Sequence, residues 1–314
     1  MAFVNSSGYA GLTDTPLARV GYAKKFVNRF FCNGMIPDIT YSDYDAELVQ
    51  CNQIVQFTKQ PIVRWKPYQK NQDLIPQEVD LDNFCFELCE ADYVSIKIDT
   101  MDEKYLCERF KEWEASVMLS VQQDKEQRLN RYVLGRLPLE VAPQSTGLTA
   151  GYDTQVSLGS SGSPVTLTPN TFVQQISYHQ LVLTEACAWE DGKMALVVPP
   201  AFYNLLLNGP LSNALTMGNC VNCSSQITGK APGQVMGFDV YKSTYAPKIV
   251  GGSASWILAG RKDATMFAED IITSRIIQST KGFWKEYQML MVYGEKTIQP
   301  QAWTAGAYIA QQTN

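Results

Sequence analysis

A long helix with one apolar stripe is the strongest constraint on how this chain of 314 residues can fold. Thr100 is suited to cap its start, and apolar side chains then recur at spacings of three and four residues. They are Leu106, Phe110, Trp113, Val117 and Val121. Gly135 and Pro138 are expected to close the helix, which gives about 33 residues and a rod of roughly 50 Å. Because only one stripe is apolar, we expect residues 101–134 to form a spine that rests on a sheet.

The residues before this helix alternate between apolar and polar side chains, as β-strands do. The alternation occurs around Val63 and Trp65, again over residues 84–88, and again over residues 94–98. Residues 66–73 are polar and have no hydrophobic face. This pattern predicts a long two-stranded hairpin over residues 48–99 with a solvated tip. Such a hairpin is marginally stable alone, so it needs a surface to lie against.

The chain after the long helix mixes short strands and helices without regular βαβ spacing, which favours an α+β fold. Thr168 and Pro169 predict a helix that Gly192 ends, and Pro199 with Pro200 predicts the start of another. The other expected elements are a strand at Met194–Val198, a helix at Ala201–Asn208, strands around Val235–Tyr241 and Trp256–Gly260, a short helix near Ala264–Asp270, and strands at Ile271–Ile277 and Phe283–Tyr293.

Residues 288–303 combine a strand pattern with two strand breakers. Met289, Met291 and Tyr293 share one face of a period-two pattern. Gly294 has the φ freedom that a tight reversal needs, and Pro300 cannot donate to a continuing ladder. We therefore expect a turn at Gly294, a return strand through Ile298, and an end at Pro300.

The composition limits the classes of partner. Charged residues make up only 18% of the chain while hydrophobic residues make up 45%, which indicates either a surface covered by partners or a neutral, polar one. The net charge of −5 gives no basis for tight general binding of nucleic acid. A basic segment at 1–42 and an acidic one at 78–126 could attract each other between copies, or be unrelated solvated surfaces.

The eight cysteines are expected to be reduced and buried, because the first residues show no signal-peptide pattern. No apolar run is long enough to span a bilayer, so no membrane partner is expected. Cys220 and Cys223 form a lone CxxC, and Cys85 and Cys89 are the only candidates for a second zinc-binding pair. That makes a four-cysteine zinc site a poor hypothesis.

His179 is the only histidine, which excludes multi-histidine metal sites and disfavours serine or cysteine triads. No phosphate-binding glycine motif occurs either. We therefore predict no catalytic, cofactor-binding or metal-binding residues and no cofactor. A cytosolic enzyme that depends on cysteine or carboxylate groups is the alternative from a different class.

Three segments, in this order along the chain, resemble the major capsid proteins of tailed bacteriophages with the Hong Kong 97 fold. They are Met194–Pro199 followed by Leu205 and Leu206, Gly237–Ser243, and Val292–Lys296 followed by Pro300. The resemblance implies an N-terminal arm (1–47), an extended β-hairpin loop (48–99), a peripheral domain with the spine helix (100–193), an axial domain (194–270) and a return to the peripheral domain (271–314).

The resemblance also implies a structural protein that assembles into pentamers and hexamers of an icosahedral shell around double-stranded DNA. The expected partners are further copies of the chain, a separate scaffolding protein, a portal and a cement protein, and the expected location is the virion, assembled in the host cytoplasm. The loop tip is expected to contact a neighbouring copy through Trp65, Pro67, Tyr68, Lys70 and Asp73. An encapsulin-like shell protein is the nearest alternative, although encapsulins generally have a shorter arm and hairpin. A tail or decoration protein, which should lack the spine helix, is a weaker one.

Overall fold

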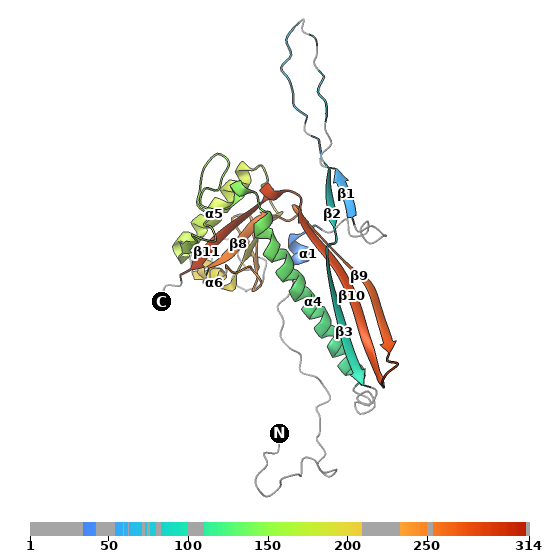
Figure 1. Cartoon of the computed structure of the whole chain (residues 1–314). Coiled ribbons are helices and arrows are strands. Elements are labelled where there is room, and N and C mark those ends of the chain that lie inside the picture. Colours follow the sequence, from blue (N-terminus) through green and yellow to red (C-terminus); the bar gives the residue numbers. More distant parts are fainter. Residues whose placement is uncertain are drawn as a thin grey trace.

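The structure, a computed structural model, has two lobes and a projecting hairpin (Figure 1). It describes residues 34–41, 54–58, 60–61, 63–70, 73, 76–79, 83–99, 110–208, 233–249 and 254–311. One lobe contains a six-stranded sheet, and the other contains a three-stranded sheet with one long helix beside it. This arrangement of helices and sheets confirms the α+β class.

The six-stranded sheet forms the first lobe. Its order is β4 (Val165–Leu167), β11 (Trp303–Ala310), β8 (Ala254–Arg261), β5 (Met194–Val198), β7 (Phe238–Lys242) and β6 (Gly233–Val235). β5 pairs parallel with β7 and antiparallel with β8, and all of its side chains are buried. The apolar run expected as a buried strand is therefore confirmed, since a strand covered on both faces needs no polar alternation.

Two helices pack against this sheet, and both begin where the sequence predicts. α5 (Pro169–Glu185) starts with a capping box in which Thr168 and Thr171 satisfy each other's backbone N–H groups. α6 (Pro200–Asn208) follows β5 directly. α5 ends well before Gly192, and Cys187 just beyond it has a positive φ of 56°.

The main core lies between these helices, the sheet and the second half of the long helix. Trp303 and Tyr308 of β11 are its largest fully buried side chains. His179 of α5 is also buried: its Nδ1 lies 2.7 Å from Thr304 Oγ1, and Tyr308 OH lies 3.0 Å from its Nε2. Burial lowers the pKa of His179 to about 3, so this histidine is a neutral structural residue.

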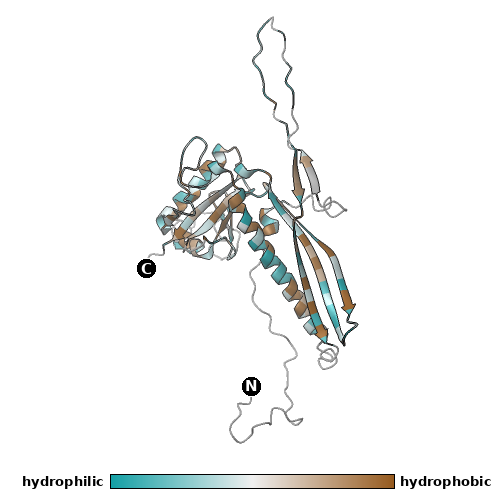
Figure 2. Cartoon of the chain, in the orientation of Figure 1, coloured by the Kyte–Doolittle hydropathy of each residue, from teal (hydrophilic) through white to brown (hydrophobic). Residues whose placement is uncertain are grey.

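The second lobe is an antiparallel sheet in the order β3 (Glu90–Asp99), β10 (Trp284–Thr297) and β9 (Thr265–Gln278). The long helix, α4 (Phe110–Glu140), runs beside it (Figure 1). Figure 2 shows hydrophobic residues along much of β9 and β10. The first four residues of β9 are buried, whereas most of its second half is exposed.

The two paired strands of the hairpin are shorter than expected. β1 (Ile54–Thr58) pairs antiparallel with β2 (Asn83–Glu87), and the described residues between them extend away from the body (Figure 1). The expected strand around Val63 is wrong, because residues 63–70 have no strand structure. The expectation for residues 94–98 was right in type but wrong in partner: β3 pairs with β10 and is not part of the hairpin.

Three of the elements expected after α6 need correction. The helix near Ala264–Asp270 is wrong, since these residues open β9 and pair with β10. The turn at Gly294 is also wrong, because β10 passes straight through it and Gly294 pairs with Ala268. Pro300 does end the strand region and opens a short 3-10 helix, η4 (Pro300–Ala302). In the expected strand over Val235–Tyr241, Met236 and Gly237 form a turn between β6 and β7.

The long helix is confirmed, with a different end. Its expected start at Thr100 lies outside the described residues. α4 continues through Gly135 and Pro138 to Glu140. A proline so close to a helix end removes only one N–H donor from the last turns, which is why it does not stop the helix earlier.

The segment before the hairpin contributes to the core. Residues 1–33 of the expected arm lie outside the described residues. The short helix α1 (Ile36–Ile39) buries Ile36 and Ile39 in the main core. Tyr41 then forms a bridge with Met266 of β9. Residues 35–41 are thus anchored where α4 and β9 meet.

Candidate assembly surface and hairpin junction

The hairpin tip presents its side chains to solvent. All five residues expected at the tip are exposed: Trp65, Pro67, Tyr68, Lys70 and Asp73. Trp65 is fully exposed and Tyr68 is 73% exposed. Large aromatic side chains are usually at least partly covered in a folded chain, so the exposure of this pair is unusual. Their role in contacting another copy stays a prediction.

The root of the hairpin is an apolar cluster separate from the main core. Phe86 of β2 is fully buried against Met266 and Ala268 of β9. Phe57 and Phe84 stack across the two strands with ring centroids 5.3 Å apart. This cluster holds the hairpin root on the three-stranded sheet, and none of the described tip residues belongs to it.

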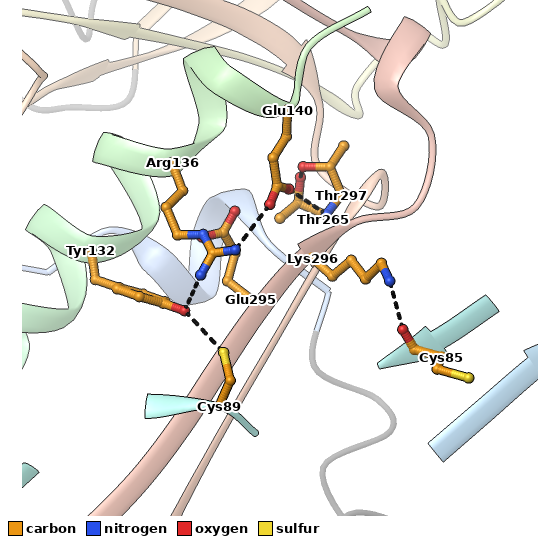
Figure 3. Close-up of polar contacts among 9 residues, drawn as sticks. All are labelled: Cys85, Cys89, Tyr132, Arg136, Glu140, Thr265, Glu295, Lys296 and Thr297. Atoms are coloured by element: carbon orange, nitrogen blue, oxygen red, sulfur yellow. Dashed lines mark hydrogen bonds and ion pairs between the residues drawn. The ribbon is translucent and has the colours of Figure 1, made fainter. Parts of the chain in front are cut away.

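β10 joins the hairpin to the body through residues 293–297, which we call the hairpin junction. On one face of β10, a Cβ atom placed on Gly294 would lie 2.5 Å from the carbonyl oxygen of Glu87. The Nζ of Lys296 donates to the carbonyl oxygen of Cys85 at 2.7 Å (Figure 3). Gly294 is therefore required because β2 crosses β10 too closely for any larger residue.

The opposite face of the junction holds a charge cluster with the end of α4. Arg136 lies between two carboxylates: its NH2 is 3.5 Å from Glu140 Oε1, and its Nε is 3.6 Å from Glu295 Oε2 (Figure 3). Its NH1 donates to Tyr132 OH at 2.7 Å. The backbone N–H of Thr297 donates to Glu140 Oε2 at 2.8 Å. These contacts fix the last turns of α4 to the end of β10.

Glu295 is the unusual member of this cluster. Its side chain is fully buried, and neither of its carboxylate oxygens has a hydrogen-bond partner among the described residues. The pKa of Glu295 is raised to about 9, chiefly by burial and further by the negative charge of Glu140, while Arg136 opposes the shift. Glu295 is therefore protonated at neutral pH.

The residues expected to form the core stripe of the long helix are only partly placed. Leu106 lies outside the described residues, and for Phe110 the structure describes the backbone only. Trp113, Val117 and Val121 are half-buried. The fully packed part of α4 comes later, at Leu129, Val133, Leu134 and Leu137. The role expected for the earlier stripe stays a prediction.

The three residues expected at a turn, Tyr293, Gly294 and Pro300, do not form one. Tyr293 and Gly294 lie within β10. Tyr293 is buried and meets Tyr132 edge to face with ring centroids 4.9 Å apart. Gly294 is the crossing point just described, and Pro300 opens η4.

The three-stranded sheet exposes large apolar side chains at its far end. Phe283, at the turn between β9 and β10, is 87% exposed, and Ile276 of β9 is 60% exposed. The others are Tyr93, Ile271, Ile272 and Leu290. β9 is also the edge strand of this sheet, and an apolar edge strand readily pairs with another chain.

The described residues offer little for catalysis. In these ranges, no group of three or more histidine, cysteine or carboxylate side chains is placed to hold a metal ion. Cys85, Cys89 and Cys187 are free and exposed, so the expectation of buried thiols is wrong for these three. Cys220 and Cys223 lie outside the described residues. None of the described helices has both the length and the apolarity that a membrane crossing requires.

Sequence reasoning missed the charge cluster. Arg136 and Glu140 have the i,i+4 spacing of a helix ion pair, which was visible in the sequence. Glu295 follows an apolar strand and shares a face with Met291 and Tyr293, which was a second available signal. Only the structure shows that Glu295 lies beside Arg136 and Glu140.

Comparison of the whole structure with solved structures finds phage capsids. The chain is similar to one from the mature capsid of bacteriophage PhiM1, with a TM-score of 0.60 and 13% sequence identity over 100% of this chain and 98% of that one. A chain from the capsid of Ralstonia phage GP4 gives a TM-score of 0.61 and 9% identity, with 100% of both chains covered. The SrpI encapsulin of Synechococcus elongatus PCC 7942 gives 0.55 and 10%, covering 94% and 93%.

Sequence comparison adds nothing to this, since no family model and no curated protein matches the chain. The structural matches nevertheless extend over nearly the whole length of both partners. They confirm, at the level of fold, the resemblance to major capsid proteins of tailed bacteriophages. The SrpI encapsulin chain matches the same fold.

Proposed function

We propose that this chain is a non-enzymatic major capsid protein, whose copies form the pentamers and hexamers of an icosahedral shell around double-stranded DNA. The observation that carries the proposal is the shared fold with phage capsid chains over the full length of the molecule. The exposed aromatic tip and the exposed apolar sheet end support it, because both surfaces need cover that one copy cannot supply.

In this proposal the elements take the parts expected of a Hong Kong 97-type subunit. α4 is the spine helix, and the hairpin with its long connection is the extended loop. The three-stranded sheet belongs to the peripheral domain and the core of the six-stranded sheet to the axial domain. The division at residues 193 and 270 stays a prediction, and strands from both sides of that range, β4 and β11, pair in the six-stranded sheet.

The tip of one copy docks on another copy. Besides its aromatic rings the tip carries three cations, Arg64, Lys66 and Lys70, against two carboxylates, Asp73 and Glu78. Glu87 and Glu90 are exposed at the hairpin root. Opposite charges on the two surfaces favour contact between copies and steer it. The remaining partners in this proposal are a scaffolding protein, a portal, a cement protein and non-specifically held DNA, with assembly in the host cytoplasm.

Removing the aromatic tip tests the proposal. The double variant Trp65→Ala with Tyr68→Ala should fold normally, because the described tip makes no contact with either core cluster. It should fail to form shells when the scaffolding protein is supplied, as measured by negative-stain microscopy and light scattering. Leu139→Ala, on an exposed leucine of α4, is the matched control and should assemble. Normal particles from the double variant would contradict the docking role of the tip.

An encapsulin-like shell is the second candidate, and the similarity to the SrpI encapsulin favours it. The contents of particles recovered from their natural source separate the two. A capsid should hold nuclease-protected DNA, whereas an encapsulin-like shell should hold protein and no DNA. A chain that stays monomeric with every assembly partner supplied would exclude both.

A further inference from the structure

The charge cluster at the hairpin junction has one cation for two carboxylates. Arg136 faces both Glu140 and Glu295, and Glu295 is fully buried. An unpaired negative charge in such a place costs several kcal/mol, so the cluster is stable only if one carboxylate is protonated. Both carboxyl groups contact this one guanidinium, and two carboxyl groups can hydrogen-bond each other only through a shared proton.

The other groups around Glu295 do not supply a second positive charge. From α4, Tyr132 faces the cluster and accepts a hydrogen bond from Arg136. From the connection between β2 and β3, the thiol of Cys89 lies 3.8 Å from Tyr132 OH. From β9, the residue paired with Glu295 is Phe267, which is apolar. Lys296 points to the opposite face of β10, toward Cys85. Both thiol and phenol could only add negative charge at high pH.

We propose that Glu140 and Glu295 share one proton, which locks α4 to β10, and that losing it loosens the hairpin root and makes shell assembly pH-dependent. The mechanical link is β10 itself. Residues 293–297 contact α4 on one face and β2 on the other, through Gly294 and Lys296. Movement of the helix end therefore reaches the hairpin root through β10, and also through the contact between Cys89 and Tyr132. The assembly part of this proposal rests on the proposed capsid function; the shared proton does not.

A direct titration of the wild-type protein tests the shared proton. Glutamate labelled with 13C at the side-chain carboxyl should give one resonance, absent from Glu295→Gln, that titrates well above pH 7. In Glu140→Gln its midpoint should fall by at least one pH unit, since Arg136 then pairs with Glu295 alone. A Glu295 midpoint in the ordinary glutamate range near 4 to 5 would overturn the proposal, as would an unchanged midpoint in Glu140→Gln.

Hydrogen exchange tests the mechanical link. Glu295→Gln keeps the shape and donor capacity of the protonated acid and cannot ionise. At pH 7 the wild type and this variant should exchange equally over residues 83–90 and 132–142. At pH 10 the wild type should exchange at least tenfold faster there than the variant. Glu112→Gln, on an exposed glutamate of α4, is the matched control and should follow the wild type. Equal exchange in wild type and Glu295→Gln at both pH values would overturn the link.

Assembly is measured separately, by light scattering at pH 7 and pH 9.5 with scaffolding protein present. The wild type should assemble at pH 7 and poorly at pH 9.5, while Glu295→Gln assembles at both. Equal assembly of the two proteins at both pH values would overturn the pH link and leave the capsid function standing. Failure of both at every pH would count against the capsid function, and the titration would still decide the shared proton. If Glu295→Gln does not fold, the Glu295 resonance can still be assigned in the wild type by through-bond NMR experiments. The titration of Glu295 therefore needs only a folded wild type.

Discussion

The six-stranded sheet and the three-stranded sheet differ in how completely one chain buries them. β5 and β8 lie inside the first sheet with nearly all side chains buried, and α5 and α6 pack on it. The far end of the three-stranded sheet exposes Ile271, Ile276 and Phe283. The first sheet is complete within one subunit, whereas the second has an apolar surface that further copies can cover. The two lobes thus differ in how much apolar surface a single chain leaves exposed.

β9 is buried at its start and exposed over most of its second half. Its first residues, Thr265–Ala268, are buried because Tyr41 and Phe86 cover them. The strand becomes exposed from Ile271 onward, beyond the reach of those two residues. The burial of β9 therefore depends on whether other residues, such as Tyr41 and Phe86, cover it. It does not depend on the strand's own composition, because apolar residues occur along its whole length.

The largest loss of folding stability is expected from a substitution in the six-stranded sheet. Trp303→Ala removes a fully buried indole from β11 and should lower the free energy of unfolding by about 3–5 kcal/mol. Denaturant unfolding monitored by circular dichroism measures it. A loss below about 1 kcal/mol would show that this lobe tolerates cavities and would break the contrast between the two sheets.

The hairpin junction should respond to a single methyl group. In Gly294→Ala the new Cβ collides with the carbonyl of Glu87, so β2 must shift and stability should fall by about 1–3 kcal/mol. Gly135→Ala is the matched control: it lies in α4 with no atom within 4 Å of the new Cβ, and it should stabilise the protein by about 0.5–1 kcal/mol. Thermal unfolding measures both. Equal shifts in the two variants would mean that β2 does not press on β10.

The two lobes should also respond oppositely to pH. The pKa of His179 is lowered to about 3, so between about pH 6.5 and 3 the unfolded chain binds a proton that the folded chain does not. Stability should therefore fall by about 1.4 kcal/mol for each pH unit below 6.5 on account of this residue. Glu295, with its raised pKa, makes stability fall as pH rises toward 9. Denaturant unfolding of His179→Gln at pH 7 and pH 5 should lack the histidine contribution, and an unchanged pH dependence would contradict the burial argument.

The smallest effect on stability is expected at the exposed sheet end. Ile276→Ser changes a side chain that is 60% exposed, so the isolated subunit should lose less than about 0.5 kcal/mol. Shell yield, measured by sedimentation, should nevertheless fall if other copies cover this surface. A large loss of stability without loss of assembly would reverse the proposed roles of the two lobes.

Elements encoded by neighbouring residues could be predicted from the sequence. Thr168 and Pro169 start α5 because a capping box and a first-turn proline act within one helical turn. The apolar run of β5 and the prolines before α6 work in the same way. The long helix was also predictable, since its apolar pattern repeats over many residues.

Features set by distant residues could not be predicted. Gly294 looks like a turn residue in the sequence, yet its role is to let β2 cross, which depends on Glu87 more than two hundred positions away. The helix expected near Ala264–Asp270 is a strand because β10 pairs with it. Glu295 looks like an ordinary charged residue, and only its burial against α4 shows otherwise.

The close crossing at Gly294 gives the hairpin the mechanics of a lever. A fully extended chain spans about 3.3 Å per residue, so Trp65, seven residues beyond the end of β1, lies at most roughly 23 Å from it. A force applied at Trp65 acts with that arm length on a pivot of five residues in β10. Small rotations at the pivot become displacements of several ångströms at the far end, and any load there is shared by Gly294, its neighbours and the apolar cluster around Phe86.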